Sequence, residues 1–455
     1  MNLNFGNNFL WGAATAAFQI EGSTSRDGRG ESIWDRFCTM PNAIKDGTDG
    51  KNACEHYQLW RHDLELMKWL GLSAYRFSIS WPRIQPEGRG LPNPQGLDFY
   101  DRLVDGLLAA GIRPFVTLYH WDLPQALEDA GGWPARDTAS RFADYASHVV
   151  ARLGDRVRDF VTHNEPYCAS MFGYRDGFQA PGRKSYGDAL RAAHHLLLSH
   201  GLAVQAVRAL AAQAEVGITL NLVPTEPASP SAVDLDAARA CDGEANRWFL
   251  DPLYGRGYPL DVVEDRLREG VLQSRELPFI QPGDMQLISS PTDFLGVNYY
   301  VRAIARAKAN GVPNEPIQVA PRDECTAMGW EVYPEGLERI LMQVHERYSP
   351  PRLYVTENGA AYDDEPPSRG GEIADLERQS YILRHLAALH RARSAGAKVD
   401  GYFLWSLLDN FEWSEGYTKR FGIVWVDYES QRRLPKHSAH RYRRVIADNG
   451  FQGAQ

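Results

Sequence analysis

The 455-residue sequence has few cysteines, and their arrangement signals no function. Five cysteines lie at irregular spacings, and no two of them form a Cys-x-x-Cys pair. An odd number without such pairs favours neither a disulfide framework nor a zinc site. His194, His195 and His200 lack the His-Glu-x-x-His pattern of a catalytic zinc helix. We therefore expect reduced thiols, no metal and no cofactor.

Long apolar runs and a positive net charge are also missing. No window approaches ~20 unbroken apolar residues, and residues 1–5 lack the basic start of a secretion signal. The net charge of −9 argues against a nucleic-acid surface. These features predict a cytoplasmic protein that binds neither membrane nor nucleic acid, and they leave the oligomeric state open. One basic cluster is expected to be a solvated helix face: Arg432, Arg433, Lys436, Arg441, Arg443 and Arg444.

Repeats, Ser/Gly linkers and low-complexity tracts are absent, so nothing marks a domain boundary. Apolar strand-like runs instead alternate with amphipathic helical stretches, which is typical of βα units. No Gly-x-Gly-x-x-Gly follows the first run to favour a doubly wound sheet. We predict an α/β fold, a single (β/α)₈ TIM barrel with expanded βα loops over residues 1–455. The eight expected strands are Phe9–Phe18, Ala74–Ser80, Arg113–Tyr119, Asp159–Asn164, Val216–Leu222, Asp293–Tyr299, Leu353–Thr356 and Gly401–Leu407.

Helices between these strands are predicted from apolar positions at helical spacing and from glycines at their ends. Gly71, Gly111 and Gly154 are expected to end three helices, and Asp137 to cap the third. Longer helices are expected over residues 188–212, 335–348 and 375–395. Polar, Gly/Pro-rich loops, which would surround the active site of a barrel, are expected at 22–32, 303–328 and 361–371.

Two of the expected strands lead into a glutamate. The run Leu353–Thr356 is followed by Glu357, and the run Asp159–Asn164 is followed by Glu165 and Pro166. A charge that ends a buried apolar strand is not there for packing. Paired carboxyl groups are what glycoside cleavage needs: one protonates the leaving oxygen, and the other is a nucleophile or a base on water. Because two close carboxylates do not easily both ionise, one becomes the acid.

Polar and aromatic residues at other strand ends fit a sugar site. Arg76 and Tyr300 are candidate donors to Glu357, and the Asn164 amide can bond a sugar 2-hydroxyl. A single polar residue of this kind is more often structural, and a single tryptophan is more often core or interface. Their joint occurrence at strand ends favours a site.

The aromatic segment 404–413 adds platforms for the apolar face of a sugar. Glu412 within it is a candidate acceptor for sugar hydroxyl groups. Trp121 and Trp330 are candidates to line the entrance.

Seven motifs, in this order, resemble those of the family 1 glycoside hydrolases, which are retaining β-glucosidases. Asn-Glu-Pro alone is a weak signal, but the series is specific and covers nearly the whole chain. The motifs are Phe9–Gly22, Tyr75–Trp81, Leu118–Pro124, Thr162–Pro166, Asn298–Tyr300, Thr356–Gly359 and Trp405–Trp413.

The resemblance implies roles for individual residues. Glu165 would be the acid/base and Glu357 the nucleophile, at the tips of the fourth and seventh strands, with carboxyl groups about 5 Å apart. The first sugar would be held by Gln19, His120, Asn164, Tyr300, Glu412 and Trp413, with Trp405 beneath its ring. Arg76, Asn298 and Tyr300 would support the nucleophile, and Trp330 would face the aglycone.

The expected activity is hydrolysis of terminal non-reducing β-D-glucosyl residues from short oligosaccharides and from aryl or alkyl glucosides, by double displacement. Tolerance for β-galactosides and β-fucosides and a role in cellulose degradation are expected as well. Relatives without the acid carry Gln at position 165, and relatives that cleave 6-phosphoglycosides lack the Glu412 carboxylate, which would repel a phosphate. A 6-phospho-β-glycosidase and a catalytically silent sugar-binding barrel remain alternatives. Transglycosylation would use the same covalent intermediate.

Overall fold

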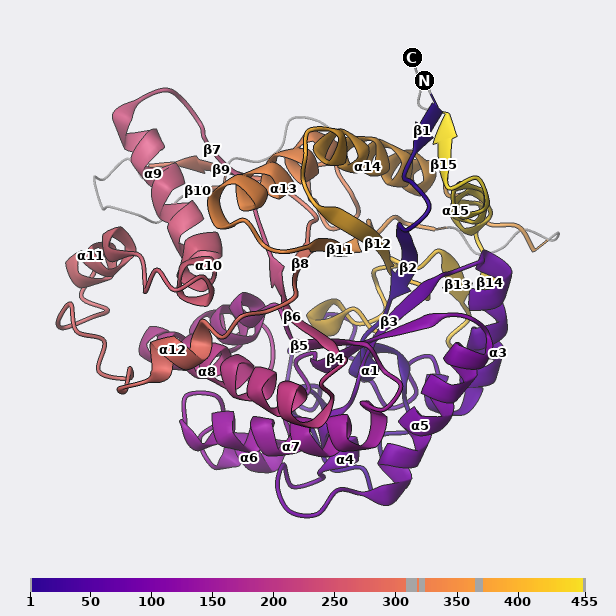
Figure 1. Cartoon of the computed structure of the whole chain (residues 1–455), viewed down its shortest axis with the longest axis horizontal. Coiled ribbons are helices and arrows are strands. Elements are labelled where there is room, and N and C mark those ends of the chain that lie inside the picture. Colours follow the sequence, from indigo (N-terminus) through magenta and orange to yellow (C-terminus); the bar gives the residue numbers. More distant parts are fainter. Residues whose placement is uncertain (1, 308–316, 319–323, 365–370, 453–455) are drawn as a thin grey trace.

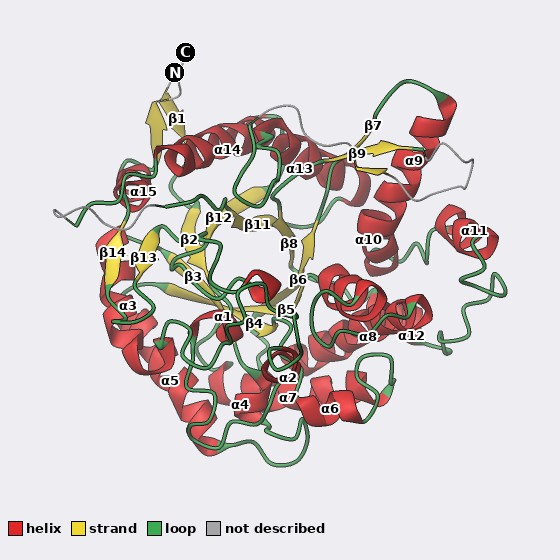
Figure 2. Cartoon of the chain, turned by 180° about the vertical axis from the view of Figure 1, so that it is seen from behind, coloured by secondary structure: helices red, strands yellow, loops and turns green. Residues whose placement is uncertain are grey.

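The computed structural model describes residues 2–307, 317–318, 324–364 and 371–452 (Figure 1). Eight parallel strands form a closed barrel in which the last strand pairs with the first, so the predicted (β/α)₈ barrel is confirmed. Figure 2 shows the helices as an outer ring around these strands. In barrel order the strands are β2 (Leu10–Ala14), β3 (Ala74–Ser78), β4 (Arg113–Tyr119), β5 (Asp159–Asn164), β6 (Glu215–Asn221), β8 (Phe294–Asn298), β11 (Leu353–Asn358) and β12 (Val399–Trp405).

The barrel strands are apolar because both of their faces are covered. Every residue of β5 and of β11 is buried. Inside the barrel, the Phe115 ring lies 5.3 Å from Phe294, 5.1 Å from Tyr354 and 4.9 Å from Phe403, centroid to centroid. These large side chains fill the interior, so the barrel is a packed core and ligands are restricted to its ends.

Long helices cover the outside of the barrel and follow the predicted segments closely. Gly71 and Gly111 lie just beyond two of them with φ of +77° and +72°, a conformation that glycine adopts without steric cost. Gly154 ends a third helix, as predicted. These helices are α3 (His56–Leu70), α5 (Pro94–Ala109), α7 (Asp137–Leu153), α8 (Tyr186–Leu210), α13 (Pro334–Tyr348), α14 (Leu376–Ser394) and α15 (His437–Ala447). Among the helices described, none is long and apolar enough to cross a membrane.

Short elements occupy the connections. The helical ones are α1 (Ala17–Ile20), α2 (Ile33–Phe37), α4 (Trp81–Ile84), α6 (Gln125–Asp129), the π-helix η1 (Cys168–Asp176), α9 (Ala232–Asp242), the π-helix η2 (Gly243–Arg247), α10 (Trp248–Leu253), α11 (Leu260–Arg268), α12 (Asp284–Ile288) and the 3₁₀ turn η3 (Trp413–Glu415). Three small sheets pair β1 (Asn2–Asn4) with β15 (Gly450–Gln452), β13 (Val424–Val426) with β14 (Arg433–Pro435), and β9 (Ala303–Arg306) with both β7 (Thr225–Pro227) and β10 (Ile317–Gln318).

Three local predictions are corrected. The first strand was predicted to reach Phe18, but it ends at Ala14 and Ala17–Ile20 is helical, because a short buried apolar run fits either structure. Asp137 is the first helical residue rather than the cap, and its carboxylate pairs with Arg141 at 2.9 Å. The predicted loop 303–328 contains β9 and β10, while residues 308–316, 319–323 and, in the loop 361–371, 365–370 lie outside the described residues.

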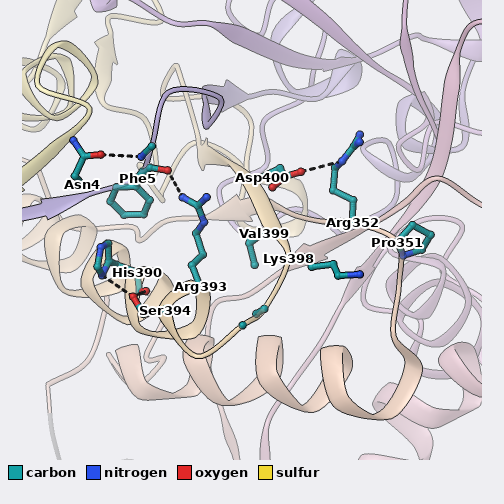
Figure 3. A pocket seen from close by; sticks show the side chains of 13 residues that line it. Asn4, Phe5, Pro351, Arg352, His390, Arg393, Ser394, Lys398, Val399 and Asp400 are labelled. Carbon is teal, nitrogen blue, oxygen red and sulfur yellow. Dashed lines mark hydrogen bonds and ion pairs between the residues drawn. The ribbon is translucent and has the colours of Figure 1, made fainter.

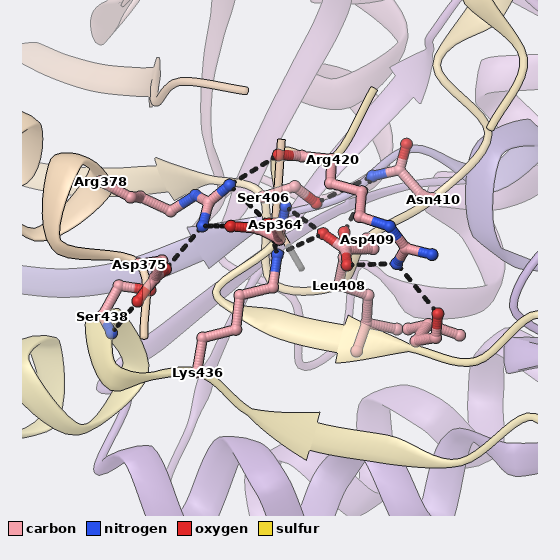
Figure 4. Close-up of polar contacts among 12 residues, drawn as sticks. Asp364, Asp375, Arg378, Ser406, Leu408, Asp409, Asn410, Arg420, Lys436 and Ser438 are labelled. Atoms are coloured by element: carbon pink, nitrogen blue, oxygen red, sulfur yellow. Dashed lines mark hydrogen bonds and ion pairs between the residues drawn. The ribbon is translucent and has the colours of Figure 1, made fainter. Parts of the chain in front are cut away.

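A buried cluster of charges joins α14, α15 and the segment after β12, and we call it the structural charge cluster (Figure 4). Lys436 is 0% exposed, and its Nζ lies 2.6 Å from Asp364 and 2.7 Å from Asp409. The expectation of a solvated basic face is therefore wrong for Lys436, and also for Arg433, which is buried against Asp63 at 2.9 Å. The cluster comprises Asp364, Asp375, Asp409, Arg378, Arg420 and Lys436.

Candidate active site

A cavity of about 580 Å³ lies at the carboxyl ends of the barrel strands, where the enzymes of this fold carry their active sites. Its lining combines groups from six loops that are far apart in the sequence. The innermost polar and aromatic members are His120, Glu165, Asn298, Tyr300, Glu357, Trp405, Glu412 and Trp413.

A second cavity, of about 610 Å³, lies at the opposite end of the barrel, around the starts of β11 and β12 (Figure 3). Three of its charged groups are bound within the protein: Arg352 pairs with Asp400 at 3.0 Å, and Arg393 donates to the carbonyl oxygen of Phe5 at 2.5 Å. This end of a barrel contributes to stability. Volume alone therefore does not distinguish the two cavities. What distinguishes them is whether their charged groups are already paired within the protein.

Glu357 lies near the end of β11 and is held by two strong donors. Nη1 of Arg76 is 2.5 Å from one carboxylate oxygen, and the Tyr300 hydroxyl donates to the other at 2.7 Å. Burial raises the pKa of Glu357, while the charge of Arg76 and the bond from Tyr300 oppose that rise. Gly359, two residues on, allows the tips of β11 and β12 to meet, since a Cβ there would lie 1.6 Å from the Trp405 carbonyl oxygen.

Glu165 directly follows β5, and its hydrogen-bond donor is a neutral amide rather than a charged guanidinium group. Its carboxylate accepts from the Asn298 amide at 2.7 Å, and its backbone is left-handed, with φ of +48°. A non-glycine residue in that region costs of order 1–3 kcal/mol, a strain that clusters at functional sites. Burial and the nearby charge of Glu357 raise the pKa of Glu165. The pKa of Glu165 is raised to about 8, whereas Arg76 and Tyr300 oppose the rise at Glu357.

A chain of side-chain bonds fixes the orientation of His120. Oδ1 of Asn164 accepts from Arg76 at 2.6 Å and from Asn298 at 3.0 Å, so the Asn164 amide NH₂ faces Nε2 of His120, 3.0 Å away. Burial and the charge of Arg76 hold the pKa of His120 well below its usual value. The neutral ring thus carries its hydrogen on Nδ1, which is buried and has no protein partner.

Glu412 lines another side of the cavity with Gln19 behind it, and their contact joins the two ends of the sequence. Nε2 of Gln19 lies 3.4 Å from Glu412 and also donates to Asn410 at 3.0 Å. Oε1 of Gln19 is buried without a protein partner. Burial, with the charges of Glu357, Glu415 and Glu165, raises the pKa of Glu412 to about 8.

Aromatic rings close the inner end of the cavity. The Trp413 ring lies 4.7 Å from Trp121 and 5.9 Å from His120, and His120 lies 5.8 Å from Trp405. On the outer side the half-buried Trp330 packs on Tyr300 at 5.5 Å. The sequence-predicted residues thus converge, although Gln19, Arg76 and Asn164 do not reach the cavity lining and lie behind it.

Several lining residues were missed from the sequence because they lie outside strand tips. Cys168 lines the cavity and interacts with Glu165, and it opens η1, a π-helix. Such helices occur frequently at functional sites, but their sequence carries no clear signature. Other missed lining residues look like core residues in the sequence, among them Tyr167, Phe172, Phe178, Leu222, Val301 and Met328. Among the described residues, no three His, Cys, Asp or Glu side chains are grouped as a metal site would require.

A closed (β/α)₈ barrel with two buried glutamates facing one cavity defines a class of enzyme that works with paired carboxyl groups. Comparison with known proteins agrees. The profile of glycosyl hydrolase family 1 matches residues 1–451. Beta-glucosidase A of Acetivibrio thermocellus is 45% identical over 451 residues, 99% of each chain.

Solved structures give the same result. The family 1 β-glucosidase of Thermotoga maritima superposes with a TM-score of 0.95 at 44% identity, covering 99% of this chain and 100% of that one. The AHE enzyme of Alicyclobacillus herbarius also gives a TM-score of 0.95, at 49% identity, with 99% of both chains covered. The chain belongs to glycosyl hydrolase family 1 and is a glycoside hydrolase.

Proposed function

We propose that the protein is a retaining β-glucosidase that removes terminal non-reducing β-D-glucosyl residues from short oligosaccharides and from aryl and alkyl glucosides. The observation that carries the proposal is that the two glutamates have different hydrogen-bond donors. Arg76 and Tyr300 favour the charged form of Glu357, whereas Glu165 has an amide partner and a raised pKa. Environments that give two neighbouring carboxyl groups different pKa values in this way identify one as the acid and the other as the nucleophile. The β-glucosidase names of the A. thermocellus and T. maritima relatives support the choice of sugar.

In the first half of the proposed reaction, the Glu357 carboxylate attacks the anomeric carbon. The bond from that carbon to the glycosidic oxygen breaks, and the proton of Glu165 passes to this oxygen, which leaves as an alcohol. The product is a glycosyl ester on Glu357. Formation of the ester removes the charge of Glu357, so the pKa of Glu165 falls and Glu165 becomes a base.

In the second half, water gives a proton to Glu165 and attacks the anomeric carbon from the side the alcohol left. The ester bond breaks and Glu357 regains its charge. Two displacements at one carbon retain the β configuration. An alcohol in place of water gives transglycosylation by the same steps.

Two unpaired buried atoms support the proposed sugar subsite. The Nδ1 hydrogen of His120 and Oε1 of Gln19 have no protein partner, and such a group costs roughly 1–3 kcal/mol until a ligand bonds to it. Sugar hydroxyl groups both donate and accept, so they satisfy either one. Asn164, Tyr300, Glu412 and Trp413 complete the proposed subsite, with Trp405 beneath the ring and Trp330 toward the aglycone.

A preference for unphosphorylated sugars is part of the proposal. Lys and Arg are absent from the described residues that line the cavity. A phosphate would therefore meet Glu412 and Glu415 without a cation to pair with. A 6-phosphoglucoside is expected to be a poor substrate.

The remaining features are proposed on more general grounds. Barrel strands are drawn from residue 10 to residue 405, which supports one catalytic domain over residues 1–455. Buried Cys54 and Cys168 form no disulfide in the described structure, which fits a cytoplasmic location and a reducing environment. Breakdown of cello-oligosaccharides, as in cellulose degradation, and tolerance of β-galactosides and β-fucosides follow if the same groups meet the altered hydroxyl groups.

The test is a panel of aryl glycosides, cello-oligosaccharides and a 6-phosphoglucoside with the wild-type protein, Glu357→Gly and Glu165→Ala. We expect the wild type to hydrolyse the glucosides, Glu357→Gly to be inactive, and azide to restore turnover of an activated glucoside by Glu165→Ala. Full turnover by Glu357→Gly would refute the assignment. Tight glucoside binding by titration calorimetry, without release of sugar from any substrate, would establish the silent sugar-binding barrel instead.

A further inference from the structure

The inner and outer parts of the active-site cavity differ in chemistry. The inner part carries the glutamates and their hydrogen-bonding partners, as described above. The outer part is mostly apolar and takes its side chains from the segment after β5, from the segments after β6 and β8, and from the turn around Met328 and Trp330. A volume of about 580 Å³ is that of sites for ligands larger than one sugar ring. The outer part therefore has the room and the surface for a flat apolar group.

One wall of this outer part is a row of three aromatic rings. Tyr167 lies two residues after Glu165, and its ring is 5.4 Å from Phe172 in an edge-to-face arrangement at 84°. Phe172 in turn is 4.7 Å from Phe178, at 42°. The row thus begins beside the carboxyl group that protonates the leaving oxygen, and it continues toward solvent.

Phe178 at the end of this row is exposed, which is unusual for phenylalanine. It is 48% exposed, and of the exposed large apolar side chains in the described structure it alone lines the cavity. Its backbone is fixed, because the amides of Gly177 and Gln179 on either side both donate to the carbonyl oxygen of Phe172, at 2.9 and 3.4 Å. A ring that is held in place with open area toward solvent is preorganised for a ligand.

We propose that Phe178 is the outer platform of the aglycone site and makes the enzyme selective for glucosides with a second flat ring beyond the one attached to the scissile oxygen. The ring is either an aryl group or a further sugar, because an aromatic side chain packs on either. Gln179, which lines the same part of the cavity, supplies an amide for hydroxyl groups of a sugar. This inference rests on the proposed β-glucosidase activity.

The experiment compares kcat/KM for two pairs of substrates: biphenyl-4-yl against phenyl β-glucoside, and cellotriose against cellobiose. Phe178→Ala is expected to lower both long-to-short ratios about three- to tenfold, mainly through KM, since an aromatic contact is lost. Phe178→Trp keeps a flat ring and is expected to keep both ratios within about twofold. Leu260→Ala, which truncates another exposed apolar residue that is not part of the lining, is the matched control and is expected to leave both ratios unchanged.

The outcomes distinguish a failure of the proposed function from a failure of the proposed Phe178 platform. If the wild type cleaves neither phenyl glucoside nor cellobiose, the proposed function fails. If it cleaves both but Phe178→Ala leaves the ratios at the wild-type value, or if Leu260→Ala lowers them equally, the function stands and the platform is refuted. A drop with the aryl pair alone restricts the platform to aromatic aglycones and overturns its role for a further sugar.

Discussion

Two buried clusters of charge lie within the same barrel, and they are composed differently. The structural charge cluster sets three acids, Asp364, Asp375 and Asp409, against three bases, Arg378, Arg420 and Lys436. The cluster around the cavity sets three acids, Glu165, Glu357 and Glu412, against Arg76.

The pKa values follow from this difference. Lys436 and Arg378 outweigh the effect of burial on Asp364, so its pKa is lowered. In the cavity the pKa values of all three glutamates are raised. Balanced charges keep a buried cluster structural, whereas an excess of acids raises their pKa values toward the range in which proton transfer is possible. The four predictions below test this contrast.

The largest effect is expected from Glu357→Gln, which removes the nucleophile and one of the excess charges. We expect kcat for phenyl β-glucoside to fall by about 10⁴-fold or more. The pKa of Glu165 is also expected to fall, because the charge of Glu357 raises it. Steady-state kinetics and NMR titration of the Glu165 carboxyl measure the two effects. An unchanged Glu165 titration would mean that the carboxyl groups are not coupled.

Glu165→Gln is expected to have a smaller effect that depends on the leaving group. General acid catalysis contributes about 10²–10⁴-fold, and this is lost where the leaving oxygen is strongly basic. A dinitrophenyl glucoside needs no protonation, so its glycosylation step is expected to be nearly unaffected. Pre-steady-state release of the phenol measures that step. Equal losses for phenyl and dinitrophenyl glucosides would contradict the acid role.

Lys436→Met removes one positive charge from the structural charge cluster. We expect this substitution to lower the stability of the protein. Removing one partner of a buried ion pair costs about 3–5 kcal/mol of unfolding free energy, because Asp364 and Asp409 lose their shared cation. Urea unfolding measures the change. Lys398→Met, at an exposed lysine, is the control and is expected to stay within about 0.5 kcal/mol. The pH dependence of kcat is expected to be the same in both variants.

Tyr300→Phe is expected to have the smallest effect, since it removes one donor and leaves every charge in place. A hydrogen bond to a charged group is worth about 1.5–3 kcal/mol, which corresponds to about 10- to 100-fold in kcat. The lost bond lowers the pKa of Glu357, so this pKa rises in the variant. Glu357 must be ionised to attack, so the acidic limb of the pH–rate profile is expected to move to higher pH.

Tyr299→Phe is the matched control for that variant. The Tyr299 hydroxyl donates to the Tyr333 carbonyl oxygen at 2.5 Å and touches neither glutamate. We expect a loss of stability but no movement of the acidic limb. A shift of equal size in both variants would assign it to packing rather than to the bond with Glu357.

The barrel was readable from the sequence because strands covered on both faces must be continuously apolar. The same rule placed Glu165 and Glu357, since a charge at the end of such a strand is out of place. It failed at Ala17–Ile20, where a short apolar run is helical. It also gave no information on the excursion formed by β7, β9 and β10, of which β7 and β9 are only partly buried.

The burial of Lys436 and the exposed position of Phe178 at the cavity were not predictable for a related reason. Both depend on partners supplied by other segments: Asp364 lies 72 residues from Lys436, and the cavity beside Phe178 is completed by loops after other strands. A lysine defaults to the surface and a phenylalanine to the core when the sequence is read locally. Here the lysine is buried and the phenylalanine is exposed.

The pairing of β12 with β2 has a consequence for the order in which the enzyme becomes active during synthesis. Gln19 is among the first residues made, yet its side-chain partner Asn410 is 391 residues later. Glu165 and Glu357 are both translated before Trp405, Glu412 and Trp413 exist. A chain that still lacks β12 cannot close the barrel, and Trp405, Glu412 and Trp413 are missing from the cavity. The full set of cavity-lining residues thus exists only after the eighth strand and the segment behind it have been made.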